Sequence, residues 1–441
     1  MRFQHPAHPE LGLRLGYGLN LYPSEDVDGV YAGLTSVALA LRERLASGAR
    51  AFGVGAWLPA RAALELDRDA RQGARWCEFL AASGLDAFTF NAFPYGGFHR
   101  AGLKERVFEP TWMEPERLEF TLAVARLAAR ARAVHGGSRD GQHLSISTHA
   151  GRFGDFSAGE RERCAENLVN AALELARLER ESGERVVLSI EPEPRSSAND
   201  TTALALLFAA ARQRARGARP AEEAVERHLG ACLDTCHAAV EFERPDEAYR
   251  RATADGTALG KLQFSSALAL VAPDREDGGR ERLLSLDEPT YLHQVTARRA
   301  DELIRARDLS EVRARYSSGD PAWRDSAEWR CHFHVPVDLA TPASLPLGRT
   351  PESAESGGLQ TTRAEAEATL REALRAPERW RSRELHVEIE TYTWNLFACA
   401  RSRPDELVAG LEREWRHLLA LLRAAGWHPV EALNAGSAAA R

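Results

Sequence analysis

The chain has 441 residues, 44% of them hydrophobic, and its 57 basic and 64 acidic side chains give a formal net charge of −7. This length exceeds that of a typical single domain but suits one large barrel with insertions, and the apolar fraction is enough for an ordinary core. The acidic balance argues against nonspecific binding to nucleic acid, which needs a basic surface.

Short apolar segments alternate with helical patterns along most of the chain. Each segment is bounded by glycine, proline or polar residues, which is typical of strands in a parallel sheet. The predicted strands cover residues 13–20, 50–57, 86–93, 144–149, 186–191, 229–235, 260–266 and 385–391.

Helical patterns occupy the intervals between these strands. Ser157 and Glu160 have the spacing of a capping box at the start of one helix, and Asn199 is predicted to cap the next. The alternation of strands and helices predicts a single (β/α)8 TIM-barrel domain over residues 1–441. The clearest helical patterns cover residues 24–47, 115–134, 158–182, 200–215 and 404–425.

The alternation breaks between the seventh and eighth strands. Residues 268–330 are charged, and their pattern predicts helices at 287–308 and 309–316. Residues 339–362 are rich in proline, serine and glycine. Long irregular segments within a compact domain are usually functional or disordered. We therefore expect an inserted segment at 268–362 that could act as a lid over the strand ends.

The six cysteines are scattered and form no CxxC pair, which argues against a zinc ribbon or a redox pair. We interpret them as buried thiols in a reducing cytoplasm. The first ten residues lack the apolar core of a signal peptide. No run of about twenty apolar residues is present, so we expect a cytoplasmic protein without a membrane span. The sequence gives no indication of the oligomeric state.

Four predicted strands end in residue types that bind metal ions, beginning with the segment LSIEPEP. Glu191 and Glu193 share a face of this strand, which two prolines stop. Burying a carboxylate is costly unless an opposite charge pairs with it, and one divalent cation can serve several strand ends. Glu191 is therefore a predicted metal ligand. Glu193 is explained equally well as a solvated loop carboxylate or as a substrate contact.

The segment LDTCHA ends another strand with Asp234, and His237 follows three residues later, where the chain turns into a helix. This spacing can bring both side chains toward one site. Alternatively, Asp234 caps the helix and His237 is a surface histidine. Because the IEPEP segment occurs in the same chain, we favour Asp234 as a metal ligand. We favour His237 as a catalytic residue that holds a substrate hydroxyl.

Two further strands carry histidine or glutamate at alternating positions. His332 and His334 share one face of HFHVPV, a common metal-binding geometry. One buried histidine bonded to backbone and one exposed histidine would explain the same pattern; of the two, we favour His334 as a ligand. In HVEIET, Glu390 lies nearest the carboxyl end and is a predicted ligand. Glu388 could support the ligands, pair with an arginine or contact the substrate.

Other polar or aromatic side chains fall near predicted strand ends, where hydrogen bonding or core packing explains them equally well. His149 ends the fourth strand and is a possible ligand, whereas Asn20 ends the first. Asn91, Gln263 and Trp394 are candidates for substrate binding, the last with Tyr392 as part of an apolar pocket wall.

Lysine occurs only at positions 104 and 261, because arginine supplies nearly all of the basic charge. Chance survival of two lysines in an arginine-rich chain would explain both positions. Alternatively, the compact ammonium group of Lys104, in the loop after the third strand, neutralises a phosphate or an enolate. The motifs GxSxG, GxxxxGK[ST] and HExxH are absent from the sequence.

At these residues the chain resembles the xylose-isomerase-like barrel superfamily, which includes sugar epimerases and endonuclease IV. DTCHA resembles the strand-six motif of endonuclease IV, and Glu191, Asp234 and Glu390 match the usual metal carboxylates of the superfamily in order. His149 falls where endonuclease-IV-like sites place a histidine. The strand-seven histidine of the superfamily would fall at Gln263, so His334 could take over that position from the insertion.

A closer resemblance, over most of residues 13–396, is to the Ebo-type (EboE-like) metabolite-traffic proteins. That family is associated with the export or handling of small metabolites, so the resemblance implies a place in a metabolite-traffic pathway. The motifs that carry the resemblance are LGYGLNLYPSE, NAFPYGGFHRAGLKERVFEPTW, SIEPEP, LDTCHAAVEFE, YLHQV, HFHVPV and IETYTW.

The sequence thus predicts a metal-dependent isomerase or epimerase acting on a small polyol or sugar-like metabolite. Glu191, Asp234, His334 and Glu390 would hold Mn²⁺, Mg²⁺ or Zn²⁺, because mixed oxygen and nitrogen ligands do not choose among these ions. The resemblance to epimerases implies that Glu191 and Glu390 also act as acid and base. Lys104 would neutralise developing negative charge.

Two other functions fit the same motifs. One is a phosphoester hydrolase of the endonuclease IV type with two or three metals, for which the additional histidines are His149, His237, His332 and His334. The acidic net charge then favours a small phosphoester over DNA. The other is a non-catalytic metabolite carrier, suggested by the family resemblance and by glutamine at position 263.

Overall fold

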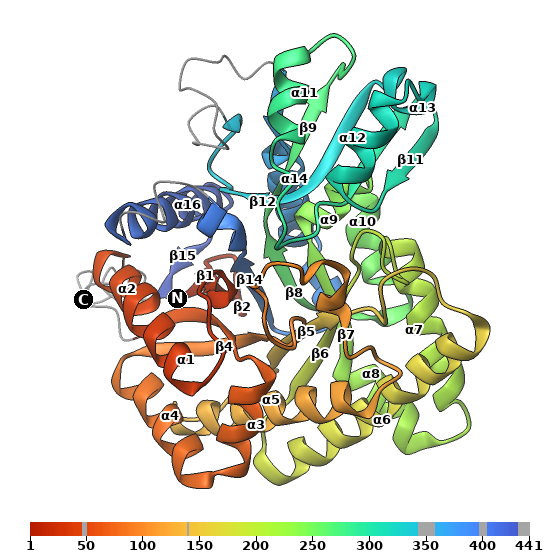
Figure 1. Ribbon diagram of the computed structural model, residues 1–441. Coiled ribbons are helices and arrows are strands. Elements are labelled where there is room, and N and C mark those ends of the chain that lie inside the picture. The colour runs from red at the N-terminus through yellow and green to blue at the C-terminus, as the bar shows by residue number, and fades with distance from the viewer. Residues whose placement is uncertain (46–50, 139–140, 343–357, 397–403, 431–441) are drawn as a thin grey trace.

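Eight parallel strands close into a barrel in the computed structural model, which describes residues 1–45, 51–138, 141–342, 358–396 and 404–430 (Figure 1). The last barrel strand, β14, pairs with β8 on one side and with β2 on the other, which closes the ring. The predicted TIM barrel is therefore confirmed. In sheet order the barrel strands are β2 (His8–Gly18), β3 (Phe52–Trp57), β4 (Leu85–Asn91), β5 (Leu144–His149), β6 (Val186–Glu191), β7 (Leu229–Asp234), β8 (Ala258–Phe264) and β14 (Glu384–Ile389).

Two short strands extend the barrel sheet beyond β2. Strand β1 (Arg2–His5) pairs antiparallel with β2, and β15 (His428–Pro429) pairs with β1. Both ends of the described chain therefore lie at this edge. The final residues 431–441 lie outside the described part.

Helices surround the barrel, and none in the described part is long and apolar enough to cross a bilayer. Six of those outside the insertion, α3, α4, α8, α9, α10 and α14, were not delimited from the sequence. The helices outside the insertion are α1 (Val27–Gly33), α2 (Ala40–Leu45), α3 (Ala60–Arg68), α4 (Ala70–Ala82), α5 (Pro115–Val134), α6 (Ala158–Ser182), α7 (Thr201–Ala215), α8 (Arg219–His228), α9 (Thr235–Val240), α10 (Pro245–Ala252), α14 (Arg363–Arg375) and α16 (Pro404–Ala424).

Local side-chain bonds fix several helix starts. Ser157 and Glu160 form the predicted capping box of α6. The prediction for Asn199 is wrong: Asp200 caps α7 by accepting from the amide of Ala203 at 2.8 Å. The Asn199 side chain instead accepts from the Arg195 amide at 2.8 Å and donates to a carboxylate oxygen of Glu241 at 2.6 Å.

The inserted segment folds as a second, antiparallel sheet above the barrel (Figure 1), with strand order β11-β10-β12-β9-β13. The predicted helix at 287–308 is wrong, because 295–306 forms a hairpin that turns at Ala300, where φ is +51°. The helix predicted at 309–316 is confirmed as α12. Residues 343–357 lie outside the described part. The elements are β9 (Ser266–Val271), α11 (Asp277–Leu284), β10 (Val295–Arg299), β11 (Glu302–Ala306), α12 (Leu309–Ser317), α13 (Pro321–Arg324), β12 (Glu328–Val335) and β13 (Leu359–Thr361).

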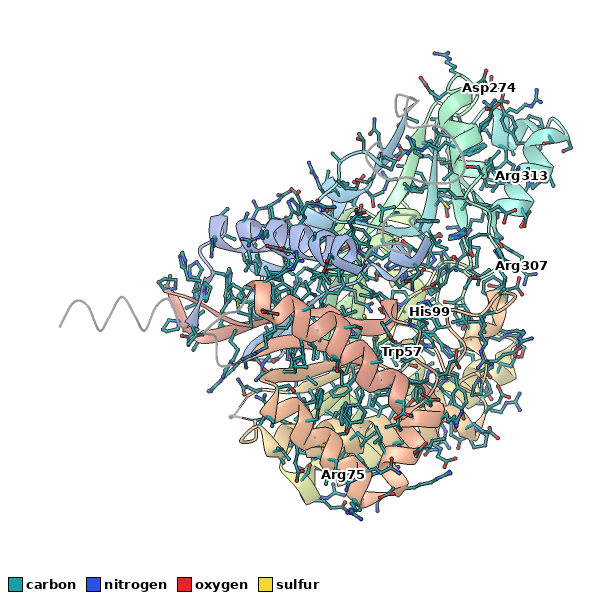
Figure 2. The ribbon with its side chains drawn as sticks, turned by 60° about the vertical axis from the view of Figure 1, so that its left-hand side comes forward. Trp57, Arg75, His99, Asp274, Arg307 and Arg313 are labelled. Atoms are coloured by element: carbon teal, nitrogen blue, oxygen red, sulfur yellow. The ribbon has the colours of Figure 1, made fainter. Side chains whose placement is uncertain are left out.

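The inserted sheet is joined to the barrel mouth at both of its long strands. Strand β9 begins only two residues after β8 ends, and β12 carries His332 and His334 back toward the barrel. The loop after β4 also contacts the insertion, because the Gly102 amide donates to Pro289 O at 2.6 Å. Figure 2 shows His99 and Arg307 where the inserted segment meets the barrel.

The barrel interior is unusual in holding buried ion pairs. Arg14 donates to Glu384 at 2.7 Å and to Asp86 at 2.9 Å near the amino-terminal end. Farther along the barrel axis, Lys261 donates to the carboxylate of Glu388. Gly55 leaves room for this pair, because a Cβ there would overlap the Glu388 carboxylate. Each charge in these pairs thus has an opposite partner, as burial requires.

The described cysteines are buried and form no disulfide, which confirms the prediction of buried thiols for these residues. Cys399 lies outside the described part. The buried cysteines are Cys77, Cys164, Cys232, Cys236 and Cys331.

Candidate metal centre

Three carboxylates meet at the carboxyl end of the barrel. Glu191 ends β6, Asp234 ends β7 and Glu390 immediately follows β14, so the parallel topology brings them to one mouth. One oxygen from each lies within 4.8 Å of the other two. All three residues are buried. The structure therefore brings together the three acidic ligands that were predicted from the sequence.

This cluster of carboxylates has no basic partner. In the described ranges, no arginine or lysine lies within ion-pairing distance of Glu191, Asp234 or Glu390, and Lys261 is engaged with Glu388. Burial raises the pKa of Glu191 well above its usual range, and the charges of Glu390 and Asp234 add to this effect. Burial and the charge of Asp234 likewise raise the pKa of Glu390. Either a bound cation or a proton would relieve this repulsion.

His334 places a ring nitrogen beside these acids. Its Nδ1 lies 2.9 Å from Glu390 O, a carbonyl that can only accept, so Nδ1 carries the proton and Nε2 keeps its lone pair. That Nε2 lies 4.0 Å from Asp234 Oδ2. Three buried atoms here lack any hydrogen-bond partner: Glu191 Oε2, Asp234 Oδ2 and His334 Nε2.

Such unpartnered acceptors are costly in a protein interior unless a cation or a proton binds them. Asp234 is held firmly, because its other oxygen accepts from the amide of Cys236 at 2.7 Å and from Ser265 Oγ at 2.6 Å. Burial opposes its ionisation, but His237, His334 and these hydrogen bonds lower its pKa overall. The donor set is compatible with a divalent metal ion.

Two asparagines orient Glu390. Asn20 Nδ2 donates to Glu390 Oε1 at 2.6 Å, and Asn91 Nδ2 donates to the same oxygen at 3.2 Å. The side-chain oxygen of Asn91 accepts from the Phe93 amide at 2.8 Å, which fixes its orientation. Both asparagines line the cavity described below, but their amide groups are engaged with Glu390.

A second group of ligand atoms lies beside the first. His237 Nδ1 is 3.0 Å from Pro192 O, and His332 Nδ1 is 2.6 Å from Gln294 Oε1. Both Nδ1 atoms are therefore donors, and in neutral rings the two Nε2 lone pairs face each other at 3.1 Å. Glu193 Oε2 lies 3.0 Å from His237 Nε2. A proton or a metal ion between these atoms would remove the repulsion.

Gln294 was missed by the sequence analysis. It donates through Nε2 to Glu193 Oε1 at 2.9 Å and accepts from His332, so it orients both members of the second group. The segment YLHQV contained the signal, but the helix predicted at 287–308 obscured it. Had the hairpin been predicted, the position of Gln294 directly before strand β10 would have indicated that its side chain can orient neighbouring residues.

Several predicted residues are not brought to the two ligand groups. The His149 ring packs against Phe93 and Phe108, with ring centres 5.1 and 5.4 Å away. Gln263 accepts from Cys232 Sγ at 2.9 Å within the barrel. His149 belongs to no group of His, Cys, Asp and Glu ligand atoms among the residues described. His149 therefore contributes to an apolar wall in this structure, and Gln263 lies below the ligands.

The remaining predicted contacts have protein partners of their own. Glu388 pairs with Lys261, and Trp394 Nε1 donates to Glu414 at 2.9 Å, so neither side chain lines the cavity. Lys104 lines the cavity, but its Nζ lies 2.6 Å from Asp308 Oδ2. The charge of Lys104 is therefore already neutralised.

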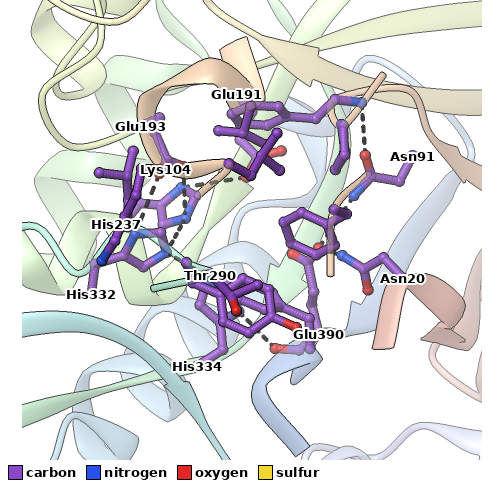
Figure 3. Close-up of a pocket in the computed structure, with 18 residues that line it drawn as sticks. Asn20, Asn91, Lys104, Glu191, Glu193, His237, Thr290, His332, His334 and Glu390 are labelled. Carbon is purple, nitrogen blue, oxygen red and sulfur yellow. Dashed lines mark hydrogen bonds and ion pairs between the residues drawn. The ribbon is translucent and has the colours of Figure 1, made fainter. Parts of the chain in front are cut away.

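A cavity with about 530 Å³ of free space opens above the ligand groups (Figure 3). The loop after β4 and the segment before β10 both contribute to its lining. Glu191, Glu193, His237, His332, His334 and Glu390 gather on one side of it.

We expect the metal-free protein to lose stability as pH rises from about 5 to 8. Burial raises the pKa of Glu193 to about 7, and those of Glu191 and Glu390 are also raised. A carboxyl with a raised pKa in the folded state binds its proton more tightly than when unfolded. Its stabilising effect is therefore complete below the usual carboxyl pKa and is lost as pH rises through the raised value.

The melting temperature with and without a chelator tests this expectation. Added Mn²⁺ or Zn²⁺ should raise it more at pH 8 than at pH 5.5, because the ion replaces the lost protons. In Glu191→Gln, the melting temperature of the metal-free protein should depend less on pH. A metal effect that is equal at both pH values would contradict the expectation.

No protein-family model matches the sequence, and no curated protein matches it. Among solved structures, D-allulose 3-epimerase from Methylomonas sp., in complex with D-allulose, is 14% identical, with 59% of this chain and 75% of that chain covered and a TM-score of 0.35. A probable 3-DHS dehydratase involved in petrobactin synthesis, from Bacillus anthracis, is 13% identical over 57% and 73%, with a TM-score of 0.36. A xylose isomerase domain containing protein from Salmonella typhimurium is 11% identical over 92% and 97%, with a TM-score of 0.36. None of these structures supports the Ebo-type resemblance, and likenesses this weak leave substrate and metal undecided.

Proposed function

We propose that this protein is a metal-dependent isomerase or epimerase of a small polyol or sugar-like hydroxycarbonyl compound. Glu191, Asp234, His334 and Glu390 would hold Mn²⁺, Mg²⁺ or Zn²⁺. The observation that carries the proposal is the set of buried, unpartnered acceptor atoms at the barrel mouth, which no basic side chain of the described part neutralises.

The residues around this centre suit proton transfer at carbon. When bound, a divalent cation would polarise neighbouring substrate oxygens and acidify the carbon between them. We assign removal of the proton from that carbon to the carboxylate of Glu191. Glu390 returns a proton to the opposite face in an epimerisation, or to the adjacent carbon in an isomerisation. His237 holds a substrate hydroxyl.

The charge of the cavity favours a neutral substrate over a phosphoester. Lys104 is the only lysine or arginine among the described lining residues, and Asp308 neutralises it. Glu191, Glu193 and Glu390 give the same cavity several acidic groups. A phosphate would therefore enter an acidic pocket without a free cationic side chain, which is unfavourable unless metal ions compensate.

Turnover in D₂O tests the proposal. We expect metal-loaded protein to incorporate deuterium at the carbon next to the carbonyl of a suitable α-hydroxyketone, detected by proton NMR. D-fructose, D-allulose and 2-hydroxyacetophenone form a starting panel. Chelator treatment should abolish exchange, and the added metal should restore it. Equal, poor conversion by stripped and loaded protein would remove support for this activity, and product without deuterium would contradict the proton-transfer roles.

The second ligand group supports one alternative, a multi-metal phosphoester hydrolase. Glu193, His237 and His332 offer three ligand atoms within 4.8 Å of one another, next to the first group. Metal analysis separates the two functions. Two or three zinc ions per chain, with release of nitrophenol from bis(p-nitrophenyl) phosphate, would favour hydrolysis, whereas one ion per chain favours isomerisation.

A further inference from the structure

The cavity has two chemically different regions. Its floor holds the ligand groups described above, whereas its remaining wall is mainly apolar. Side chains from separate clusters of packed apolar residues form this wall, and they come from the loop after β4, from the insertion and from the segment after β14. The wall residues are Phe93, Pro94, Phe98, Leu103, Val107, Tyr291, Leu292 and Tyr392.

Apart from Thr290, which also lines the cavity, the polar groups beside this wall have protein partners. Tyr291 OH lies 2.6 Å from His99 Nδ1, and Tyr392 OH lies 3.3 Å from His332 Nε2. Lys104 is paired with Asp308. The unpartnered buried acceptors that line the cavity, such as Glu191 Oε2 and His334 Nε2, lie at the floor.

This division restricts what the cavity can bind. A compound with hydroxyl groups along its whole length would leave those beside the wall without partners, and each such buried hydroxyl costs affinity. An apolar group at the same place would release water from Phe98, Leu103 and Leu292 and would be favoured. A charged group there would face no free cationic side chain among the described lining residues.

We propose that the substrate is amphiphilic and uncharged. One end carries neighbouring oxygens that the metal centre takes up, and the other carries a compact apolar or aromatic group that packs against the wall. The proposal rests on the function proposed above, because the oxygen-bearing end is assigned to that centre. It also gives the insertion a role in specificity, since Tyr291 and Leu292 precede its strand β10.

Two hydroxamates with the same chelating head test the proposal. Calorimetric titration of Zn²⁺-loaded protein should show benzohydroxamate binding about tenfold or more tightly than acetohydroxamate, because the phenyl ring buries additional apolar surface. Leu103→Gln and Leu292→Gln should each weaken benzohydroxamate several-fold and leave acetohydroxamate unchanged. Leu64→Gln, on the outer helix α3, is the matched control and should change neither.

The possible outcomes distinguish a failure of the metal centre from a failure of the amphiphilic substrate. If the zinc-loaded protein binds neither hydroxamate, the metal centre and the amphiphilic substrate are both overturned. Equal affinity for the two compounds overturns the amphiphilic substrate and leaves the metal centre standing. The same holds if the two wall substitutions leave the benzohydroxamate affinity unchanged, or if D-allulose displaces benzohydroxamate at a lower concentration than 1-phenyl-1,2-ethanediol does.

Discussion

Glu191→Gln and Glu390→Gln are expected to abolish tight metal binding while leaving the barrel folded. Each substitution replaces an anionic ligand with a neutral amide of almost the same shape, so the affinity for the divalent ion should fall by more than about 100-fold. Turnover should fall by about a thousandfold, within the range for the loss of a general acid or base. Metal per chain, measured by elemental analysis after gel filtration, gives the primary result.

The same variants should show an opposite effect on stability when metal is absent. Wild-type protein then holds three mutually repelling carboxylates, so removing one charge should raise the melting temperature of the metal-free protein at pH 8. Added metal should no longer raise it further. Glu105→Gln, in a surface pair with Arg307, is the control and should behave as wild type. Normal metal content in both site variants would exclude these glutamates as ligands.

Lys261→Met is expected to destabilise the protein by about 3–5 kcal/mol, the usual cost of breaking a buried ion pair. Lys261 and Glu388 are buried inside the barrel, and Glu388 has no other described cationic partner. Removing the ammonium group leaves an uncompensated carboxylate among apolar strands. Urea denaturation, monitored by circular dichroism, measures the change in the free energy of unfolding.

Two further variants identify the cause of that loss. Lys261→Met combined with Glu388→Gln should recover most of the stability, because no unpaired charge remains. Lys104→Met removes the only other lysine, which is partly exposed in its pair with Asp308, and should cost less than about 1 kcal/mol. A double variant no more stable than Lys261→Met would show that packing, not charge, explains the effect.

Local patterns in the sequence were sufficient to predict the barrel and its acidic mouth. Strand alternation places Glu388 and Glu390 on the inner face of one strand, and parallel strands must end at the same side. Glu191 and Asp234 could therefore be assigned to one site without knowing any contact. The capping box at Ser157 was equally readable, because all of its partners lie within four residues.

Only the tertiary structure determined which charges are free and which are paired. Lys261 and Glu388 are 127 positions apart, and no local pattern encodes their pairing. Gln294 and His332 meet through antiparallel pairing in an insertion whose hairpin was mistaken for a helix. Strand period and direction therefore suffice to place the acidic side chains at one end of the barrel. Long-range packing decided that Lys104 is neutralised, that His149 lies in an apolar wall and that the histidines of the insertion reach the barrel mouth.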